Sequence, residues 1–221
     1  MAISDERDMP PPPLGYAQVH RHPPPPGLGF PGPPPEIPEV PVGLLARARG
    51  GRGEGPARRP VSEVVWSWLG AALGIYAIVW PSTQMLPGTE SVFLIGSFGA
   101  SAVLVYGVPF ADLAQPRNVL GGHVVSAAVG VTVQHLVGDL ALASAIAVAT
   151  AIAAMHVTRT IHPPGGATAL IAVIGGMGIT DLGYTYVVAP VGVSAVAMLA
   201  IGIVVNNLSR NPARHYPKYW W

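Results

Sequence analysis

The chain has 221 residues, of which 50% are hydrophobic, only 10% are charged and none is cysteine. An average soluble protein carries about 25% charged residues, so this composition indicates an integral membrane protein in a lipid bilayer. The lack of cysteine excludes disulfides, thiolate nucleophiles and cysteine-ligated metals within the chain. A formal net charge of +1 gives no indication of a nucleic-acid partner, and we expect none.

Residues 1–60 form a polar, proline-rich stretch. Runs of four prolines at Pro10–Pro13 and Pro23–Pro26 favour extended polyproline II and bury no core. We therefore expect a disordered cytoplasmic tail over 1–60 and a transmembrane domain over 61–221. Docking on a proline-binding module is the alternative role of the tail.

Apolar segments separated by short polar breaks follow the tail. They cover about residues 63–80, 92–108, 117–137, 139–157, 164–179 and 184–207. A straight span needs about 20 residues, so the second and fifth segments, which are short and interrupted by glycine, are expected to be two short broken helices. Each is either a full span with a kink or an extended entry followed by a half-helix. The predicted fold class is an all-α membrane protein with about six apolar segments.

The residues between the segments indicate the topology. With six crossings and both termini inside, the inner loops contain Arg117 and Arg159, whereas Glu90, Asp139 and Asp181 lie outside. This separation agrees with the positive-inside rule. The expected location is the inner (plasma) membrane of a bacterium, with cytoplasmic N- and C-termini. The closing aromatic residues are expected to anchor the chain in the membrane interface: Tyr216, Tyr219, Trp220 and Trp221.

An internal similarity joins the second segment to the fifth. The sequence GASAVL at Gly99–Leu104 resembles GATALI at Gly166–Ile171, and VSA occurs in both the third and the sixth segment. A possible inverted repeat of three segments each follows, because an odd number of crossings inverts the second copy. Inverted repeats with interrupted helices are typical of transporters that bind substrate near the midplane. Chance matching of alanine-rich sequence is the alternative.

The repeat predicts an anion site between two opposed helix N-termini, one near Gly99 and one near Gly166. A helix N-terminus presents unpaired N–H groups and a partial positive charge, and glycine lets a ligand approach the backbone. Proline is favoured in the first turn of a helix, which suits the sequence HPPGGAT. The expected substrate-binding residues are Ser97, Gly99, Ala100, Ser101, His162, Gly165, Gly166, Ala167 and Thr168.

Further polar residues are candidates for a vestibule or gate: Arg117, Asn118, His123 and Arg159. Polar side chains inside spans usually face the bundle interior and are often functional. For His123 the alternative is a purely structural role, in which the imidazole links neighbouring helices. The arginines either draw anions inward or determine topology alone. His162 is either a pH-responsive gate or substrate contact, or else an N-terminal helix cap or a loop histidine hydrogen-bonded to the backbone. An unperturbed imidazole titrates at about pH 6.5, so flux should rise as the pH falls if either histidine takes part.

Ordered motifs of the chain resemble the HPP family of integral membrane proteins: SFGASAVLVYG, LAQPRNVLGGH, HPPGGATAL and the closing NNL…YPKYWW. The family takes its name from the sequence found here at His162–Pro164, and the resemblance covers roughly residues 60–221. Its members are usually described with four membrane helices, and some plant-chloroplast and cyanobacterial members are linked to nitrite transport. The resemblance therefore implies membrane transport of a small inorganic anion such as nitrite.

We thus expect a transporter or channel for a small monovalent inorganic anion, working as a homo-oligomer and without a cofactor or bound metal. Enzymatic activity is not expected, since HExxH, GxSxG and paired carboxylates within a span are missing. Haem or a metal held by the intramembrane histidines is one alternative. The other is a structural or sensory membrane protein without transport activity.

Overall fold

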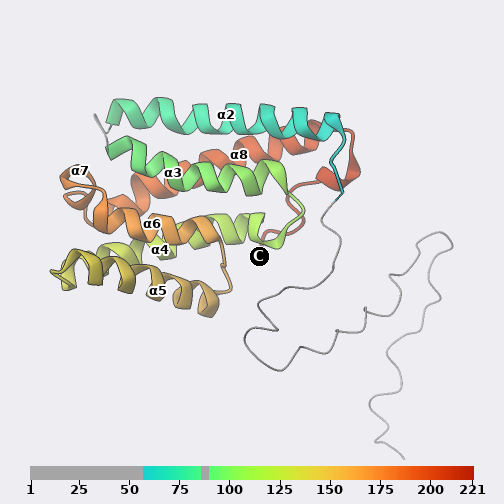
Figure 1. Ribbon diagram of the computed structural model, residues 1–221. Coiled ribbons are helices and arrows are strands. Elements are labelled where there is room, and N and C mark those ends of the chain that lie inside the picture. Colours follow the sequence, from blue (N-terminus) through green and yellow to red (C-terminus); the bar gives the residue numbers. More distant parts are fainter. Residues whose placement is uncertain (1–56, 86–89) are drawn as a thin grey trace, which may run out of the picture. The chain divides into compact units, whose positions relative to one another are not determined.

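Each predicted apolar segment forms a helix in the computed structural model, which describes residues 57–85 and 90–221 (Figure 1). The α-helices, in chain order, are α2 (Val61–Met85), α3 (Glu90–Ala102), α4 (Pro116–Leu136), α5 (Leu140–Thr158), α6 (Pro163–Ile174), α7 (Met177–Thr180) and α8 (Val193–Leu208). The expected disordered tail lies outside the described residues, except for residues 57–60.

The helix lengths match a membrane-spanning bundle. Long apolar helices that can cross a bilayer cover Val61–Pro81, Pro116–Leu136, Leu140–Thr158 and Val187–Leu208. Shorter apolar helices cover Gly96–Gly107 and Pro163–Ile174, which correspond to the second and fifth predicted segments. The part of the chain that the structure describes contains no strand. The fold class is therefore that of an all-α membrane protein, as predicted.

The second segment is a continuous helix rather than an extended entry followed by a half-helix. Helix α3 runs without interruption through Gly99 into a π-helical turn, η2 (Val103–Gly107). The predicted helix start at Gly99 is therefore wrong. Residues 92–98 contain no proline that would begin a helix at Gly99, and the Ser97 side chain bonds Thr168. Pro81, which was expected to end the first segment, likewise lies inside α2.

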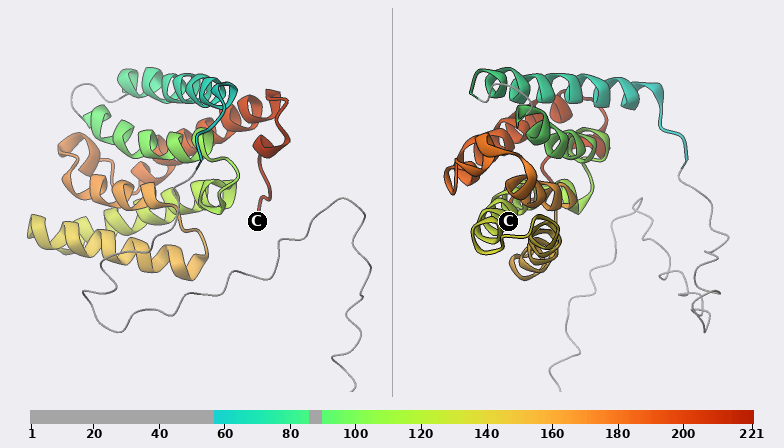
Figure 2. Two further views of the ribbon diagram at one scale, coloured as in Figure 1. Left: turned by 45° about the vertical axis from the view of Figure 1, so that its right-hand side comes forward. Right: turned by 60° about the vertical axis from the view of Figure 1, so that its left-hand side comes forward.

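The fifth segment does begin a helix at its prolines. His162 is the N-cap residue of α6, and Pro163 and Pro164 occupy its first two positions, where proline is favoured. Helices α3 and α6 lie side by side in both views of the bundle (Figures 1 and 2) and run antiparallel, because Ser97 contacts Thr168 whereas Ser101 contacts His162. The inverted repeat itself stays a prediction.

Small residues let α4 and α6 approach at backbone distance. A Cβ atom added to Gly130 of α4 would lie 2.5 Å from the carbonyl oxygen of Ala169 on α6. One added to Gly165 of α6 would lie 2.8 Å from the carbonyl oxygen of Gly122 on α4. Such contacts are typical of helix association in lipid, where van der Waals packing replaces the hydrophobic effect.

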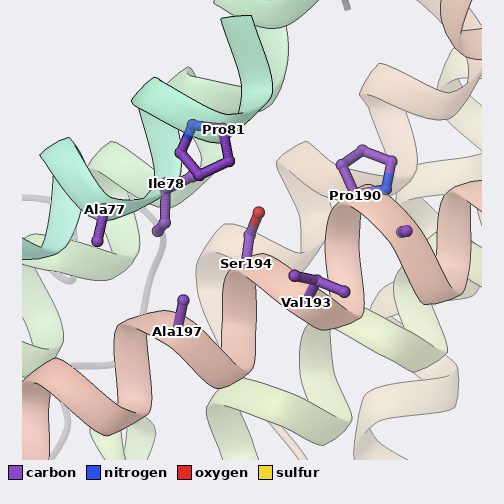
Figure 3. A pocket seen from close by; sticks show the side chains of 8 residues that line it. Ala77, Ile78, Pro81, Pro190, Val193, Ser194 and Ala197 are labelled. Carbon is purple, nitrogen blue, oxygen red and sulfur yellow. The ribbon is translucent and has the colours of Figure 1, made fainter. Parts of the chain in front are cut away.

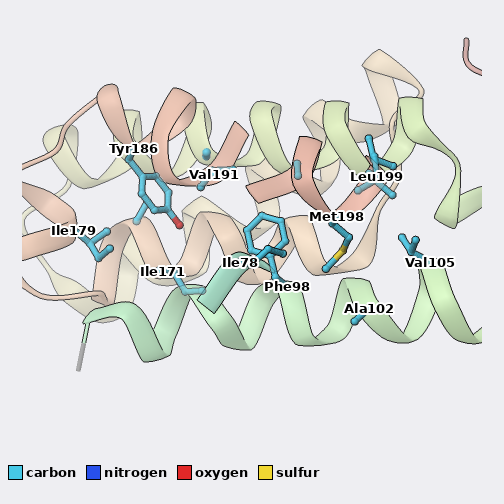
Figure 4. Packing of buried hydrophobic residues seen from close by; sticks show 14 of the residues in the cluster. Ile78, Phe98, Ala102, Val105, Ile171, Ile179, Tyr186, Val191, Met198 and Leu199 are labelled. Atoms are coloured by element: carbon cyan, nitrogen blue, oxygen red, sulfur yellow. The ribbon is translucent and has the colours of Figure 1, made fainter. Parts of the chain in front are cut away.

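A core of apolar side chains fills the space between α3, α6 and α8 (Figure 4). Phe98 of α3 and Met198 of α8 are fully buried there, next to Ile171 of α6. Tyr106 extends this core toward α2, where a Cβ at Gly70 would lie 2.6 Å from the Tyr106 ring. The phenol donates a hydrogen bond to the Met198 carbonyl at 3.1 Å. The core therefore ties α2, α3 and α8 together.

Two C-terminal side chains, those of Arg214 and Tyr216, close one end of this core. Arg214 is buried, pairs with the Glu63 carboxylate at 3.1 Å and donates to the Tyr106 carbonyl at 2.7 Å. Tyr216 is also buried and donates to the Ala114 carbonyl at 2.7 Å. The interfacial role expected for Tyr216 is therefore wrong. Carbonyls at the end of a helix lack intrahelical donors, and these side chains supply donors from a distant part of the chain.

Candidate polar site in the bundle core

Polar side chains from α3, α4 and α6 converge inside the bundle. They form what we call the imidazole–hydroxyl cluster: Ser97, Ser101, His123, His162 and Thr168. Each of these residues is at most 1% exposed. Four of them were predicted to bind substrate, whereas His123 was expected to act as a gate. The structure joins it to the other four.

Short hydrogen bonds connect the cluster into one chain. The Ser97 and Thr168 hydroxyl oxygens are 2.7 Å apart, and Thr168 Oγ1 lies 2.7 Å from His123 Nδ1. His123 Nε2 and His162 Nε2 both lie 2.8 Å from the single Ser101 Oγ. His162 Nδ1 ends the chain, 2.8 Å from the Leu113 carbonyl oxygen.

Helical spacing explains why these side chains meet. Ser97 and Ser101 are four residues apart and therefore share one face of α3. The antiparallel α6 presents Thr168 opposite Ser97, and the residue before α6, His162, opposite Ser101. Phe98 stacks on the His123 ring with centroids 4.4 Å apart. The ring of His123 is thus fixed by an aromatic face as well as by its two hydrogen bonds.

The chain has one consistent arrangement of hydrogens when both imidazoles are neutral. The Leu113 carbonyl only accepts, so His162 carries its hydrogen on Nδ1 and its Nε2 accepts from Ser101. Ser101 has a single hydrogen, so it accepts from His123 Nε2–H. His123 Nδ1 is then bare and accepts from the Thr168 hydroxyl. This assignment follows from the pattern of partners.

Ser97 completes the arrangement, because its single hydroxyl hydrogen can be donated to Thr168 Oγ1, at 2.7 Å, or to the Pro164 carbonyl oxygen, at 3.0 Å, and the first choice continues the chain. Every hydrogen-bonding atom of the cluster side chains therefore has a partner, and the five donors follow one another in a single direction. No carboxylate of the described residues contacts either ring, so the neutral form needs no counter-ion. The sequence could not predict that the Leu113 carbonyl accepts from His162, because every residue type has a backbone carbonyl.

The predicted cradle of two opposed helix N-termini is wrong at both ends. Gly99 is inside a helix. At the start of α6, Pro163 and Pro164 have no N–H to offer, and the Gly165 N–H donates to the His162 carbonyl at 2.8 Å. The same prolines that begin the helix thus remove the unpaired N–H groups that an anion needs. His162 occupies the N-cap position, but its ring bonds Ser101 and Leu113 instead of capping α6.

The remaining residues predicted to bind substrate do not reach the cluster. Ala100 is exposed, and a Cβ at Gly99 would meet open space. Gly166 and Ala167 line an apolar groove between α5 and α6. Gly165 faces α4 instead, where its would-be Cβ atom lies 2.8 Å from Ser126 Oγ.

The vestibule candidates support the turn between α5 and α6. Asn118 Nδ2 donates to the Ile161 carbonyl at 2.8 Å, and Arg117 donates to the Thr158 carbonyl at 3.2 Å. Arg159 is exposed and ends α5 in the left-handed conformation, with φ 57°. None of the three touches the cluster, although they hold the segment from which His162 extends.

A second pocket lies between α2 and the first turns of α8 with the residues just before it (Figure 3). Its walls are apolar side chains such as Ile78, Pro81 and Val193, with the Ser194 hydroxyl pointing between them. No residue predicted for the anion site lines it. In the described part of the chain, no group of three or more histidine or acidic side chains is arranged to hold a metal ion.

Comparisons with known proteins agree with the membrane architecture. The family model described as "HPP, transmembrane region" matches residues 56–217. Two Dictyostelium discoideum proteins, each named only as a transmembrane protein, are 42% identical over 170 residues and 40% identical over 179 residues. The matches cover 75% and 76% of this chain but only 54% and 61% of those proteins, so the chain spans less than two thirds of their length. No solved structure matches the chain.

Proposed function

Because the chain belongs to the HPP family of transmembrane proteins, we propose that it transports a small monovalent inorganic anion of the nitrite kind by way of the imidazole–hydroxyl cluster. The observation that carries the proposal is the convergence of its side chains, each at most 1% exposed, in the core of a membrane bundle. Polar and ionisable groups are costly inside a membrane, and they commonly mark the path of a polar solute.

The chemistry of the cluster suits an anion better than a cation. Its members supply O–H and N–H donors, and no carboxylate of the described residues touches them. Hydrogen bonds from such donors to a charged acceptor are stronger than those between neutral groups. A small anion that enters between α3 and α6 replaces the bonds of Ser97 and Ser101 to their present partners. The buried arrangement then corresponds to the occluded state of the transporter, between the states that are open to either side of the membrane.

The positions of the charged residues support a cytoplasmic location for the basic end of the bundle. We infer that both termini lie in the cytoplasm, because Arg117 and Arg159 are at one end of the bundle's long helices and Asp139 is at the other. We propose the plasma membrane as the location. Arg117 sits at the start of α4, near the α3–α4 loop to which Leu113 belongs. A positive rim there attracts anions toward the cluster.

Flux into liposomes that contain the purified full chain tests the proposal. Uptake of nitrite, nitrate, chloride and formate is compared with that of empty liposomes, and nitrate controls for nitrous acid, which crosses lipid unaided. Removing one hydroxyl in Thr168→Ala should lower anion affinity by about 1.5–3 kcal/mol, roughly ten- to a hundredfold. The matched control is Ser126→Ala, which removes a buried hydroxyl that has no hydrogen-bond partner. Uptake no faster than in empty liposomes, or equal losses in the two variants, would refute the proposal.

A further inference from the structure

Each hydroxyl that bonds a bare imidazole nitrogen has a second acceptor within reach. Ser101 Oγ lies 3.4 Å from the Ser97 carbonyl oxygen, besides its bond to His162. Thr168 Oγ1 lies 3.3 Å from the Pro164 carbonyl oxygen, besides its bond to His123. Both carbonyls belong to residues one helical turn earlier on the same helix. A hydroxyl can therefore turn away from a ring nitrogen and still donate a hydrogen bond.

This second set of acceptors lets either ring take up a proton while every heavy atom stays in place. A proton that binds His162 Nε2 makes this atom a donor to Ser101 Oγ, and the Ser101 hydrogen rotates to the Ser97 carbonyl. A proton that binds His123 Nδ1 makes that atom a donor to Thr168 Oγ1, and the Thr168 hydrogen rotates to the Pro164 carbonyl. In both cases every hydrogen retains an acceptor, and the net charge of the cluster rises by one.

Ser101 also connects the two rings to each other. When His162 is cationic and His123 carries its hydrogen on Nδ1, His162 Nε2–H gives a proton to Ser101 Oγ. Ser101 in turn gives its own hydrogen to His123 Nε2. The charge has then moved from one ring to the other, and no proton is gained or lost. The two histidines share one proton site through a common oxygen.

A second proton is opposed by repulsion between the rings, whose centroids are 4.9 Å apart. The other titratable or charged side chains on the packed elements stand apart from them. In the described region these are Tyr106 in η2, Asp112 next to Leu113, Arg117 and His135 on α4, His156 and Arg159 at the end of α5, and Tyr186. Only Tyr186 bonds a cluster residue, through the Thr168 carbonyl at 3.2 Å. The charge that balances a protonated cluster must therefore come from the substrate.

We propose that the cluster binds one proton together with the anion, so that transport is electroneutral cotransport of one proton with one monovalent anion. The inference rests on the proposed function for its anion. It adds the coupling ion, the stoichiometry and the residues that carry the proton: His123, Ser101 and His162.

The test measures nitrate and proton uptake together in liposomes containing the full chain. An inward proton gradient at zero membrane potential should drive nitrate above its equilibrium level, with one proton entering per nitrate. A membrane potential alone, imposed with a potassium ionophore, should drive none. Nitrate uptake that follows the potential without proton entry would overturn the inference and leave anion transport standing. Proton entry without uptake of any tested anion would overturn the proposed function instead, and neither flux would overturn both.

Variants and spectroscopy locate the proton. In His162→Gln and His123→Gln the ratio of protons to nitrate should fall from one to near zero, whereas Ser126→Ala should keep the wild-type ratio. Nitrogen-15 NMR of histidine-labelled protein at high pH should show His162 protonated on Nδ1 and His123 on Nε2, with each signal identified by its loss in the glutamine variant. The same tautomer on both rings, or coupling that survives both substitutions, would contradict the shared site.

Discussion

Two neighbouring glycines at the start of α6 offer a sharp test of the packing on which the cluster depends. A Cβ at Gly165 would lie 2.8 Å from the carbonyl oxygen of Gly122, 2.8 Å from Ser126 Oγ and 3.0 Å from Met155 Sδ. A Cβ at Gly166 would meet only Val148 Cγ1, at 3.9 Å, which is ordinary contact. The substitutions Gly165→Ala and Gly166→Ala therefore add the same atom at two positions about 100° apart around the axis of α6.

The expected difference follows from this geometry. Replacing glycine by alanine in a helix stabilises by about 0.5–1 kcal/mol, and this gain is common to both variants. Only Gly165→Ala forces the α4 backbone away, since a carbonyl of Gly122 cannot rotate out of the contact. Overpacking of this kind costs about 1–3 kcal/mol. Gly165→Ala should therefore be less stable than Gly166→Ala by about 1–3 kcal/mol, and Gly166→Ala should be at least as stable as the wild type.

Reversible unfolding in mixed detergent micelles, followed by circular dichroism, measures the free energy of unfolding of all three proteins. Reconstituted into liposomes, the same three proteins report transport, and nitrate uptake should fall in Gly165→Ala, because α6 also carries Thr168 and follows His162. Equal stabilities, or a larger loss in Gly166→Ala, would show that α6 presents its other face to α4.

Further predictions test other contacts. Ser101→Ala leaves His162 Nε2 and His123 Nε2–H without a partner and should destabilise the protein by about 1–3 kcal/mol, whereas Ser126→Ala should cost nothing in the same unfolding assay. Arg214→Gln removes the ion pair with Glu63, which is partly exposed and keeps its bond from Asn211, and it also removes the bond to the Tyr106 carbonyl; it should cost about 1–3 kcal/mol. An equal loss in Arg210→Gln, at an exposed position, would contradict this assignment. The chain contains no cysteine, so Arg117→Cys should label only from the cytoplasmic side and Asp181→Cys only from outside. Labelling of position 117 from outside would refute the topology.

Local signals in the sequence were sufficient to predict the helices. The third segment, expected at about 117–137, is Pro116–Leu136, and the prolines of HPPGG begin α6 as predicted. Hydropathy and proline determine where a helix lies and where it begins from nearby residues alone, because the bilayer requires every backbone group to be bonded within its own helix. The family could also be recognised, since its motifs are short and lie in order along the chain.

Contacts between distant residues were decided only by the tertiary structure. Ser101 meets His123 and His162 across 22 and 61 positions of the chain, and no periodicity in an almost uniformly apolar sequence shows which helix face turns inward. The sequence therefore predicted four members of the cluster but assigned them to a cradle of backbone N–H groups, and it separated His123 from them. Tyr216 was misplaced for the same reason. Its partner is the Ala114 carbonyl, 102 positions earlier in the chain, and only the packing of the helices brings the two together.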